Sequence, residues 1–315
     1  MKLSVLDYGV IDSGKNASIA LKETCELAKF AEKLGYNRFW LAEHHNISAF
    51  STSVPEILIS YILANTKSIR VGSGGIMALH YSPYKIAEII STLQTLYPNR
   101  VDIAFGNTLG SNKVHRALKS HFEKNDYEKV LKDISEYIEH KKNISVCPSI
   151  KEKPDFFLLS NSEKTYELSR EIDFKYTFGV FPYMPVDMYE EVKKIKNVDM
   201  LACFVVVAET NELAFEFAKC LDVWMLGKNE FNEFKTYPSV EEANKYIFTE
   251  NEKQKVLENR KRMIIGDAKS VKKQLDEYVS ISNVKELLII PLVPNIENRC
   301  KSLEILANMY INKNE

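Results

Sequence analysis

Short runs of β-forming residues alternate with amphipathic segments along the whole chain, and this alternation constrains the fold more than any other feature. Residues 18–34, for example, carry apolar side chains at helical spacing, and Gly35 follows as a helix-ending residue. Strands are expected at residues 3–8, 38–42, 69–73, 101–105, 156–159, 176–180, 201–208 and 287–290. Helices are expected at residues 18–34, 55–65, 84–97, 112–122, 126–141 and 296–311, and from residues 162, 186 and 211.

Repeated strand–helix units favour an α/β fold with a parallel sheet and helical crossovers. Eight units fit a single (β/α)8 TIM barrel, which typically takes about 250 residues. A doubly wound open sheet is the alternative. The chain has 315 residues, so an insertion is expected between strands 7 and 8, at about residues 228–262, which are charged and weakly periodic. Because no linker or repeat interrupts the pattern, residues 1–315 are interpreted as one domain.

The charge balance excludes several classes of partner. Lys and Arg total 42 and Asp and Glu total 43, for a net charge of −1. Sequence-independent nucleic-acid binding needs a basic face, and peripheral membrane binding needs a polybasic segment. We therefore expect neither nucleic acid nor a membrane as a partner.

The cysteines and the first residues indicate a cytoplasmic protein. No apolar run reaches the roughly 18 residues of a membrane-spanning helix, and residues 1–7 become charged too early for a signal peptide. Five cysteines lie scattered without a Cys-x-x-Cys pair, which indicates free core thiols in a reducing compartment. The histidines form no His-x-His and no His-Glu-x-x-His, so no metal site is expected.

In a barrel of this kind the active site lies where strands end and the loops to the next helix begin. That rule selects a small set of polar segments. They are residues 43–46, 72–77, 80–83, 106–112 and 160–162, together with Phe181, Tyr183 and Pro291.

The densest titratable cluster is Glu43-His44-His45, at the end of the second expected strand. Imidazole titrates near neutrality and suits proton transfer, and a neighbouring carboxylate can orient one ring. Adjacent residues on an extended chain point to opposite sides, so the two histidines need not face one ligand. We predict that all three residues are catalytic. One alternative is that the two histidines are ordinary loop residues held by hydrogen bonds. A second, weaker alternative is a metal hydrolase, because the later strands offer no matching metal ligands.

Glycines and small polar residues supply the candidate binding segments. The run at residues 72–75 is no dinucleotide fingerprint, because Met77 stands where the third glycine would be. Its glycines allow either close backbone approach to a flat ligand or a tight turn. The loops at 106–112 and 160–162 could either bind a phosphate or simply cap the helices that follow them. The candidate cofactor-binding residues are Gly74, Gly75, Gly106, Asn107, Thr108, Ser160, Asn161 and Ser162.

Through most of its length the chain resembles the bacterial luciferase-like flavin monooxygenases. The resemblance is strongest at residues 34–46 and continues at 69–77 and 80–83. Weaker similarity follows at residues 238–243 and 262–267.

The resemblance implies a cofactor and a reaction. The cofactor would be FMN, supplied as FMNH2 by a separate flavin reductase, and the reaction would use O2 on a small organic substrate. His44 matches the family's catalytic histidine, and Gly74–Gly75 matches its cis peptide under the flavin ring. The family also implies dimers, which the apolar helix at 84–97 would support. An enzyme that uses the deazaflavin F420 is a minor variant of this expectation.

Two departures from the family pattern concern the flavin phosphate. Asn107 stands where close relatives carry an arginine, and Leu159-Ser160-Asn161-Ser162 replaces a Gly-Ser-Ser stretch. Losing a charge-assisted contact costs roughly 1.5–3 kcal/mol. Lys113 or Arg116 could compensate for it. The alternative is a non-catalytic or flavin-storing paralogue, or a subunit of a heterodimer.

Overall fold

A computed structural model describes residues 1–119, 121–182, 195 and 197–312, and within it eight parallel strands close into a barrel. The barrel strands are β1 (Lys2–Asp7), β2 (Arg38–Leu41), β3 (Arg70–Met77), β4 (Val101–Gly106), β5 (Asp155–Ser160), β6 (Lys175–Val180), β7 (Met200–Val207) and β9 (Glu286–Ile290). Each overlaps one expected strand. The pairings β6–β7, β7–β9 and β9–β1 close the sheet. The (β/α)8 expectation is confirmed, and the open-sheet alternative is wrong.

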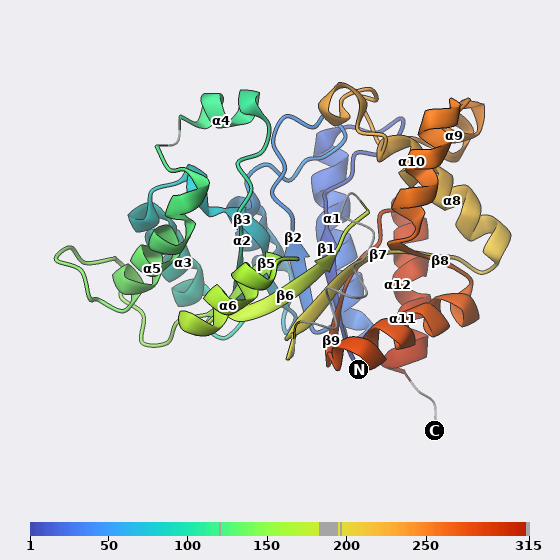
Figure 1. The fold of residues 1–315 in the computed structure, drawn as a ribbon. Coiled ribbons are helices and arrows are strands. Elements are labelled where there is room, and N and C mark those ends of the chain that lie inside the picture. The colour runs from blue at the N-terminus through green and yellow to red at the C-terminus, as the bar shows by residue number, and fades with distance from the viewer. Residues whose placement is uncertain (120, 183–194, 196, 313–315) are drawn as a thin grey trace.

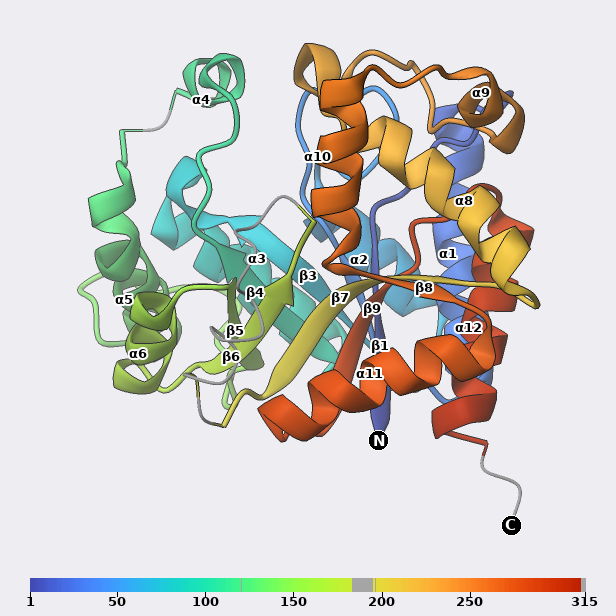
Figure 2. The same ribbon diagram turned by 45° about the vertical axis from the view of Figure 1, so that its right-hand side comes forward.

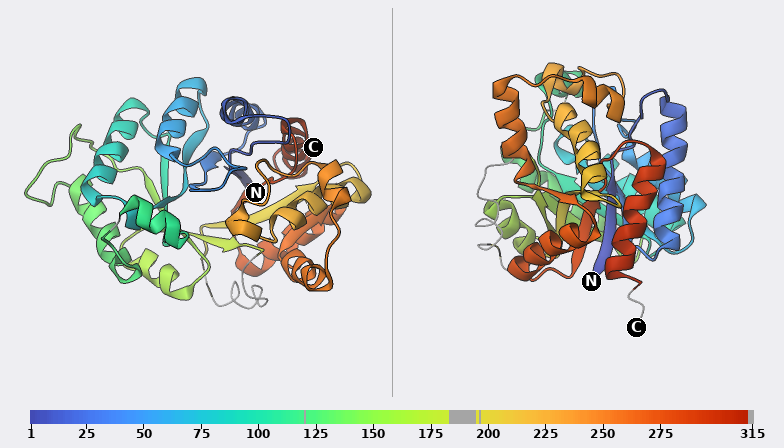
Figure 3. Two further views of the ribbon diagram at one scale, coloured as in Figure 1. Left: turned by 90° about the horizontal axis from the view of Figure 1, so that it is seen from above. Right: turned by 90° about the vertical axis from the view of Figure 1, so that its right-hand side faces the viewer.

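Helices surround the barrel, which is plain when the molecule is seen from above (Figure 3). They are α1 (Ala17–Lys33), α2 (Pro55–Asn65), α3 (Pro83–Leu96), α4 (Asn112–Leu118), α5 (Tyr127–Ile138), α6 (Glu163–Glu171), α8 (Asn211–Trp224), α9 (Val240–Lys245), α10 (Glu250–Arg260), α11 (Ala268–Ser282) and α12 (Ile296–Tyr310). Short 3-10 turns are η1 (Ala78–His80), η2 (Lys124–Asp126) and η3 (Lys228–Phe231). The helix expected from residue 186 and Tyr183 lie outside the described residues.

The region between β7 and β9 holds elements that the sequence pattern did not reveal. Residues 228–262 contain η3, α9 and α10, and α9 and α10 pack beside α8 (Figure 2). A ninth strand, β8 (Met263–Gly266), then pairs with the second half of β7, and α11 follows it. β8 was not predicted, although it is as long as β2; it directly follows the charged segment that was interpreted as an insertion.

The helix expected to supply a dimer interface uses its apolar face inside the monomer. Ser82 caps α3 by accepting a hydrogen bond from the amide of Lys85, as its sequence indicates. Ile86, Ile90 and Leu93 on α3 are buried against the barrel. Leu96 at the end of α3 is 59% exposed, and further exposed apolar side chains lie on α2, where Ile57 is 71% and Tyr61 is 46% exposed.

At the amino ends of the strands, buried charges compensate one another. Asp102 on β4 accepts hydrogen bonds from Arg38 Nη1 at 2.6 Å, Arg70 Nε at 2.9 Å and Trp40 Nε1 at 3.1 Å. Arg38 Nε also donates to Glu286 Oε1 at 3.0 Å. A buried carboxylate needs such partners, because desolvating an unpaired charge is costly. The network links β2, β3, β4 and β9 at this end of the barrel.

Two smaller expectations concern thiols and membranes. Cys25, Cys203 and Cys220 are buried free thiols, whereas Cys147 is exposed and Cys300 half-buried, so the expectation of core thiols is wrong for Cys147. Across the described residues, no helix is both long and apolar enough to cross a membrane.

Candidate active site

A cavity of about 740 Å³ opens at the carboxyl ends of the strands, within the range typical of small-molecule sites. The strands run upward in Figure 1, so their carboxyl ends lie below α4 and the insertion. The structure brings ten predicted site residues to this lining: Glu43, His44, His45, Gly74, Gly75, Gly106, Asn107, Thr108, Ser160 and Asn161. Ser162 does not line it. The Ser162 hydroxyl instead accepts from the amide of Thr165 and caps α6.

Glu43 is a buried connector between three segments of the chain. Its Oε2 accepts from the backbone amide of Met77 at 2.8 Å. Its Oε1 accepts from the Tyr81 hydroxyl at 2.6 Å and lies 2.7 Å from His45 Nε2. Because a carboxylate only accepts, Nε2 is the protonated nitrogen of His45. Glu43 therefore fixes the orientation of His45 and ties β2 to the end of β3.

Burial and the neighbouring carboxylate also act on Tyr81. Burial, followed by the charge of Glu43, raises the pKa of the Tyr81 hydroxyl. The phenol thus stays protonated at neutral pH and remains a hydrogen-bond donor to Glu43.

His44 lies in a different environment from His45. Its backbone amide donates to Thr52 O at 3.0 Å, and its ring centroid lies 4.6 Å from that of Tyr8 and 5.2 Å from that of Phe50. Its Nδ1 is buried without a hydrogen-bond partner among the described residues. Burial, with a smaller contribution from His45, lowers the pKa of His44 to about 4. His44 is therefore neutral at pH 7.

The separate environments of the two histidines also bear on the metal-hydrolase alternative. The described residues contain no group of three or more His, Cys, Asp or Glu side chains that could hold a metal ion. Within the described part of the chain, His44 and His45 have no partners for a metal site.

The glycines of β3 form part of the cavity wall rather than the tight turn that was the alternative. The Gly74–Gly75 peptide is cis, and a β-bulge lies between Gly74 and Ile76. A Cβ on Gly74 would come within 2.7 Å of Leu6 Cδ1, and one on Gly75 within 2.8 Å of Ala104 O. The absence of side chains therefore permits this close packing. At Gly106, by contrast, a Cβ would meet nothing nearer than 3.9 Å, so the cavity has room there.

The polar end of the cavity consists of neutral groups. Thr108 Oγ1 accepts from the amide of Gly110 at 3.0 Å, and Ser160 Oγ accepts from the amide of Ser162 at 3.2 Å. Asn107 and Asn161 also line this end. The Thr108 hydroxyl keeps a proton that it can donate, whereas the Ser160 hydroxyl donates to Ser162 Oγ at 3.5 Å. These groups can hydrogen-bond a polar ligand without supplying charge.

The cations proposed to compensate for Asn107 lie elsewhere. Neither Lys113 nor Arg116 belongs to the lining, and both are exposed. Lys113 Nζ pairs with Glu230 Oε1 at 3.1 Å. Among the described lining residues there is no Lys or Arg, and the acidic ones are Glu43 and Glu230.

An apolar wall completes the cavity, and most of it was missed in the sequence. It includes Tyr8, Ile47, Phe181, Phe204, Trp224, Met225 and Phe231. The Phe231 ring of η3 lies 4.7 Å from that of Trp224, between centroids. Asn232 holds the turn by donating from Nδ2 to Asn46 O at 2.6 Å. Tyr8 could have been found from its place at the end of β1, whereas the insertion gave no periodic signal.

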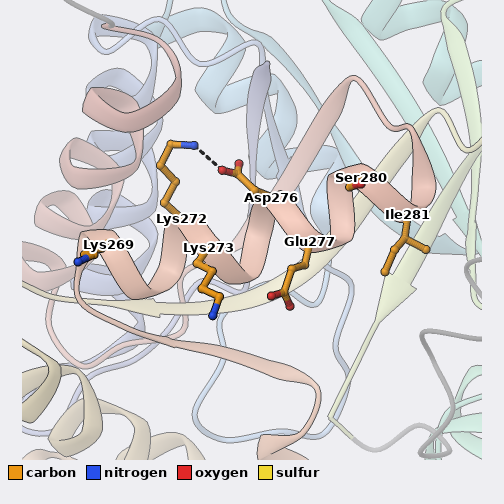
Figure 4. A pocket seen from close by; sticks show the side chains of 7 residues that line it. All are labelled: Lys269, Lys272, Lys273, Asp276, Glu277, Ser280 and Ile281. Carbon is orange, nitrogen blue, oxygen red and sulfur yellow. Dashed lines mark hydrogen bonds and ion pairs between the residues drawn. The ribbon is translucent and has the colours of Figure 1, made fainter.

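A second hollow lies on the outer face of α11 and has a different character (Figure 4). It is lined by Lys269, Lys272, Lys273, Asp276, Glu277, Ser280 and Ile281. Lys272 and Asp276 form an ion pair one helical turn apart. These are the features of a solvated helix face.

Comparisons with known proteins bear on the family and the fold. The family described as luciferase-like monooxygenase matches residues 1–155. The uncharacterized protein YceB of Bacillus subtilis is 32% identical, over 98% of this chain and 99% of its own length.

Two solved structures share the fold. Apo-MsnO8 is 26% identical, with a TM-score of 0.84 over 98% of each chain. The oxygenating constituent of 3,6-diketocamphane monooxygenase from Pseudomonas putida, solved in complex with FMN, is 14% identical. Its TM-score is 0.71 over 99% of this chain and 98% of that one.

Proposed function

The chain belongs to the luciferase-like monooxygenase family, and from this premise we propose that it uses reduced FMN and O2 to oxygenate a small organic substrate. One oxygen atom would enter the substrate and the other would leave as water. The observation that carries the proposal is His44, a neutral imidazole with an unpartnered Nδ1, in a cavity that also contains the glycine segment of β3.

The cavity fits a flavin in shape at its ring end. The backbone of Gly74 and Gly75 offers a wall without side chains, and the space at Gly106 would admit the edge of a planar ring system. Asn107, Thr108 and Ser160 would hydrogen-bond the ribityl end. When bound, reduced FMN would supply the two electrons that reduce one oxygen atom of O2 to water, while the other atom enters the product. A separate flavin reductase would supply this FMNH2.

His44 is the residue proposed to move protons. A neutral imidazole has one N–H and one lone pair, so it can accept a proton and return it within one turnover. His45 and Glu43 act through position. Glu43 holds His45 and the end of β3 together, which keeps the glycine wall and the histidine segment in register.

The apolar wall indicates an apolar part of the substrate. Phe181, Phe204 and Trp224 would bury hydrocarbon or aromatic surface and exclude water from the reacting atoms. Burial of this kind contributes about 25 cal/mol per Å² of apolar area.

The test is oxygen transfer. Purified protein would be supplied with FMN, NADH and a separate flavin reductase, and challenged under ¹⁸O2 with aliphatic aldehydes, ketones and thioethers. We expect one ¹⁸O atom in the product of at least one class. Saturable FMN binding without ¹⁸O transfer to any class would favour a flavin-storing or non-catalytic protein instead. Binding of F420 in preference to FMN would favour the deazaflavin variant.

Self-association through the early helices is part of the proposal, as a homodimer. Ile57 and Tyr61 lie one helical turn apart on α2, and Val54 precedes them, so they form an exposed apolar stripe. Sedimentation at micromolar concentration should show a dimer, and Ile57→Glu should shift it toward monomer. A wild-type monomer under these conditions would contradict this part.

A further inference from the structure

We propose that this cavity recognises a flavin by its ring system and ribityl chain rather than by its phosphate, so that it binds riboflavin about as tightly as FMN. The inference rests on the proposed flavin function and deepens it. It follows from the charges and hydrogen-bonding groups at the polar end of the cavity.

The charges at the cavity do not match a phosphate. A phosphate monoester carries about −1.5 to −2 charges at pH 7, and proteins that grip one through side chains usually use Arg or Lys. The described lining residues include no Lys or Arg but do include the carboxylates of Glu43 and Glu230. A dianion placed there would lose its hydration without gaining a counter-charge from these residues.

The nearby cation is already paired. Lys113 Nζ lies 3.1 Å from Glu230 Oε1, and the Lys113 side chain is 65% exposed. A phosphate that recruited Lys113 would have to compete with Glu230, which lines the cavity itself. Lys113 therefore adds little net positive charge to the cavity.

The helix beside this end offers little help. The amino terminus of α6 could in principle attract an anion. However, the Ser162 hydroxyl already accepts the amide of Thr165, at 3.2 Å. Glu163 adds a carboxylate to the first turn of α6, which opposes a second negative charge.

The same groups suit a polyol. Thr108 accepts a backbone amide and keeps its hydroxyl proton to donate, Ser160 accepts a backbone amide and donates to Ser162 Oγ at 3.5 Å, and the Asn107 amide both donates and accepts. Ribityl hydroxyls also donate and accept, so they complement this mixed set. Phosphate oxygens chiefly accept, and they would leave the carbonyl of the Asn107 amide without a donor.

The experiment compares riboflavin and FMN in fluorescence-quenching titrations of the wild-type protein in one buffer. We expect Kd values that agree within about threefold, and an FMN affinity that changes little with salt. An FMN affinity at least about tenfold above that of riboflavin would overturn this inference and leave the flavin function standing. Binding of neither flavin would overturn the flavin function, and this inference with it.

A charge variant sharpens the test. Asn107→Arg should shift the ratio of the two affinities roughly tenfold in favour of FMN and make FMN binding sensitive to salt. Asn107→Gln is the matched neutral control and should preserve the equal affinities. If Asn107→Arg improves both flavins equally, or neither, Asn107 does not lie at the phosphate end and the inference is wrong.

Discussion

Buried polar groups are paired differently at the two ends of the barrel strands. At the amino end, β2 and β4 carry Arg38 and Asp102, which are buried, charged and fully paired. Just beyond the carboxyl end of β2, His44 is neutral and keeps Nδ1 unpartnered among the described residues. An unsatisfied buried polar atom lowers stability, so its retention is typical of a functional position. This contrast matches the general rule for TIM barrels, in which the amino end serves stability and the carboxyl end carries the active site.

Glu43 shows that burial alone does not distinguish the two ends. Its carboxylate is as buried as that of Asp102, and it is equally well hydrogen-bonded. The difference lies in what the partners do. Asp102 links strands within the barrel, whereas Glu43 links the residues that border the cavity.

The largest expected effect is at the carboxyl end. His44→Ala should reduce turnover by about 10²–10⁴-fold, the usual contribution of a general acid or base. It should leave the fold intact, because the ring borders the cavity and its Nδ1 has no hydrogen-bond partner to lose among the described residues. Product formation with reduced FMN and an accepted substrate measures the first effect, and calorimetry the second. His121→Ala, at an exposed position, is the control. Turnover within twofold of wild type would remove His44 from the mechanism.

The opposite result is expected at the amino end. Asp102→Ala should destabilise the fold by about 3–5 kcal/mol, because it removes the buried carboxylate that Arg38, Arg70 and Trp40 share. Urea denaturation measures this change. Glu241→Ala, which removes an exposed partner of Lys245, should change stability far less. Equal effects of the two substitutions would break the comparison between the ends.

A smaller expected effect is on how the stability of the fold depends on pH. The pKa of His44 is about 4 in the folded chain and about 6.5 when unfolded, so the unfolded chain binds the proton more tightly. The stability that neutral His44 permits is complete above about pH 6.5 and is lost as pH falls toward 4. His44→Gln should therefore lose less thermal stability than wild type between pH 7 and pH 5. Parallel loss in both proteins would show that His44 is solvated and ordinary.

The sequence predicted the regular half of this molecule better than the insertion. Helical and strand periods identified the eight barrel strands, and the rule for barrel active sites then selected Glu43, His44 and Asn107 for the cavity lining. The extent of β3 through the glycines was not predicted, because glycine carries no strand signal. Trp224 and Phe231 were missed because tertiary packing, and no local period, brings them to the cavity.

Ser162 shows the limit of motif reasoning at the site. Its hydroxyl was equally suited to a phosphate or to a helix cap, and only the backbone geometry distinguishes the two roles. The structure assigns the hydroxyl to the cap of α6.

Flavin titration of a variant whose cavity is filled tests the central claim most directly. Gly106 lines the cavity, and a Cβ there would meet nothing closer than 3.9 Å, so Gly106→Leu should fold and extend into the proposed ring site. We predict saturable quenching of flavin fluorescence by wild type, and at least about a tenfold loss of affinity in Gly106→Leu at an unchanged thermal midpoint. Gly106→Ala should fall between them. Equal affinity in wild type and a folded Gly106→Leu, or no binding by wild type, would contradict the assignment of this cavity to a flavin.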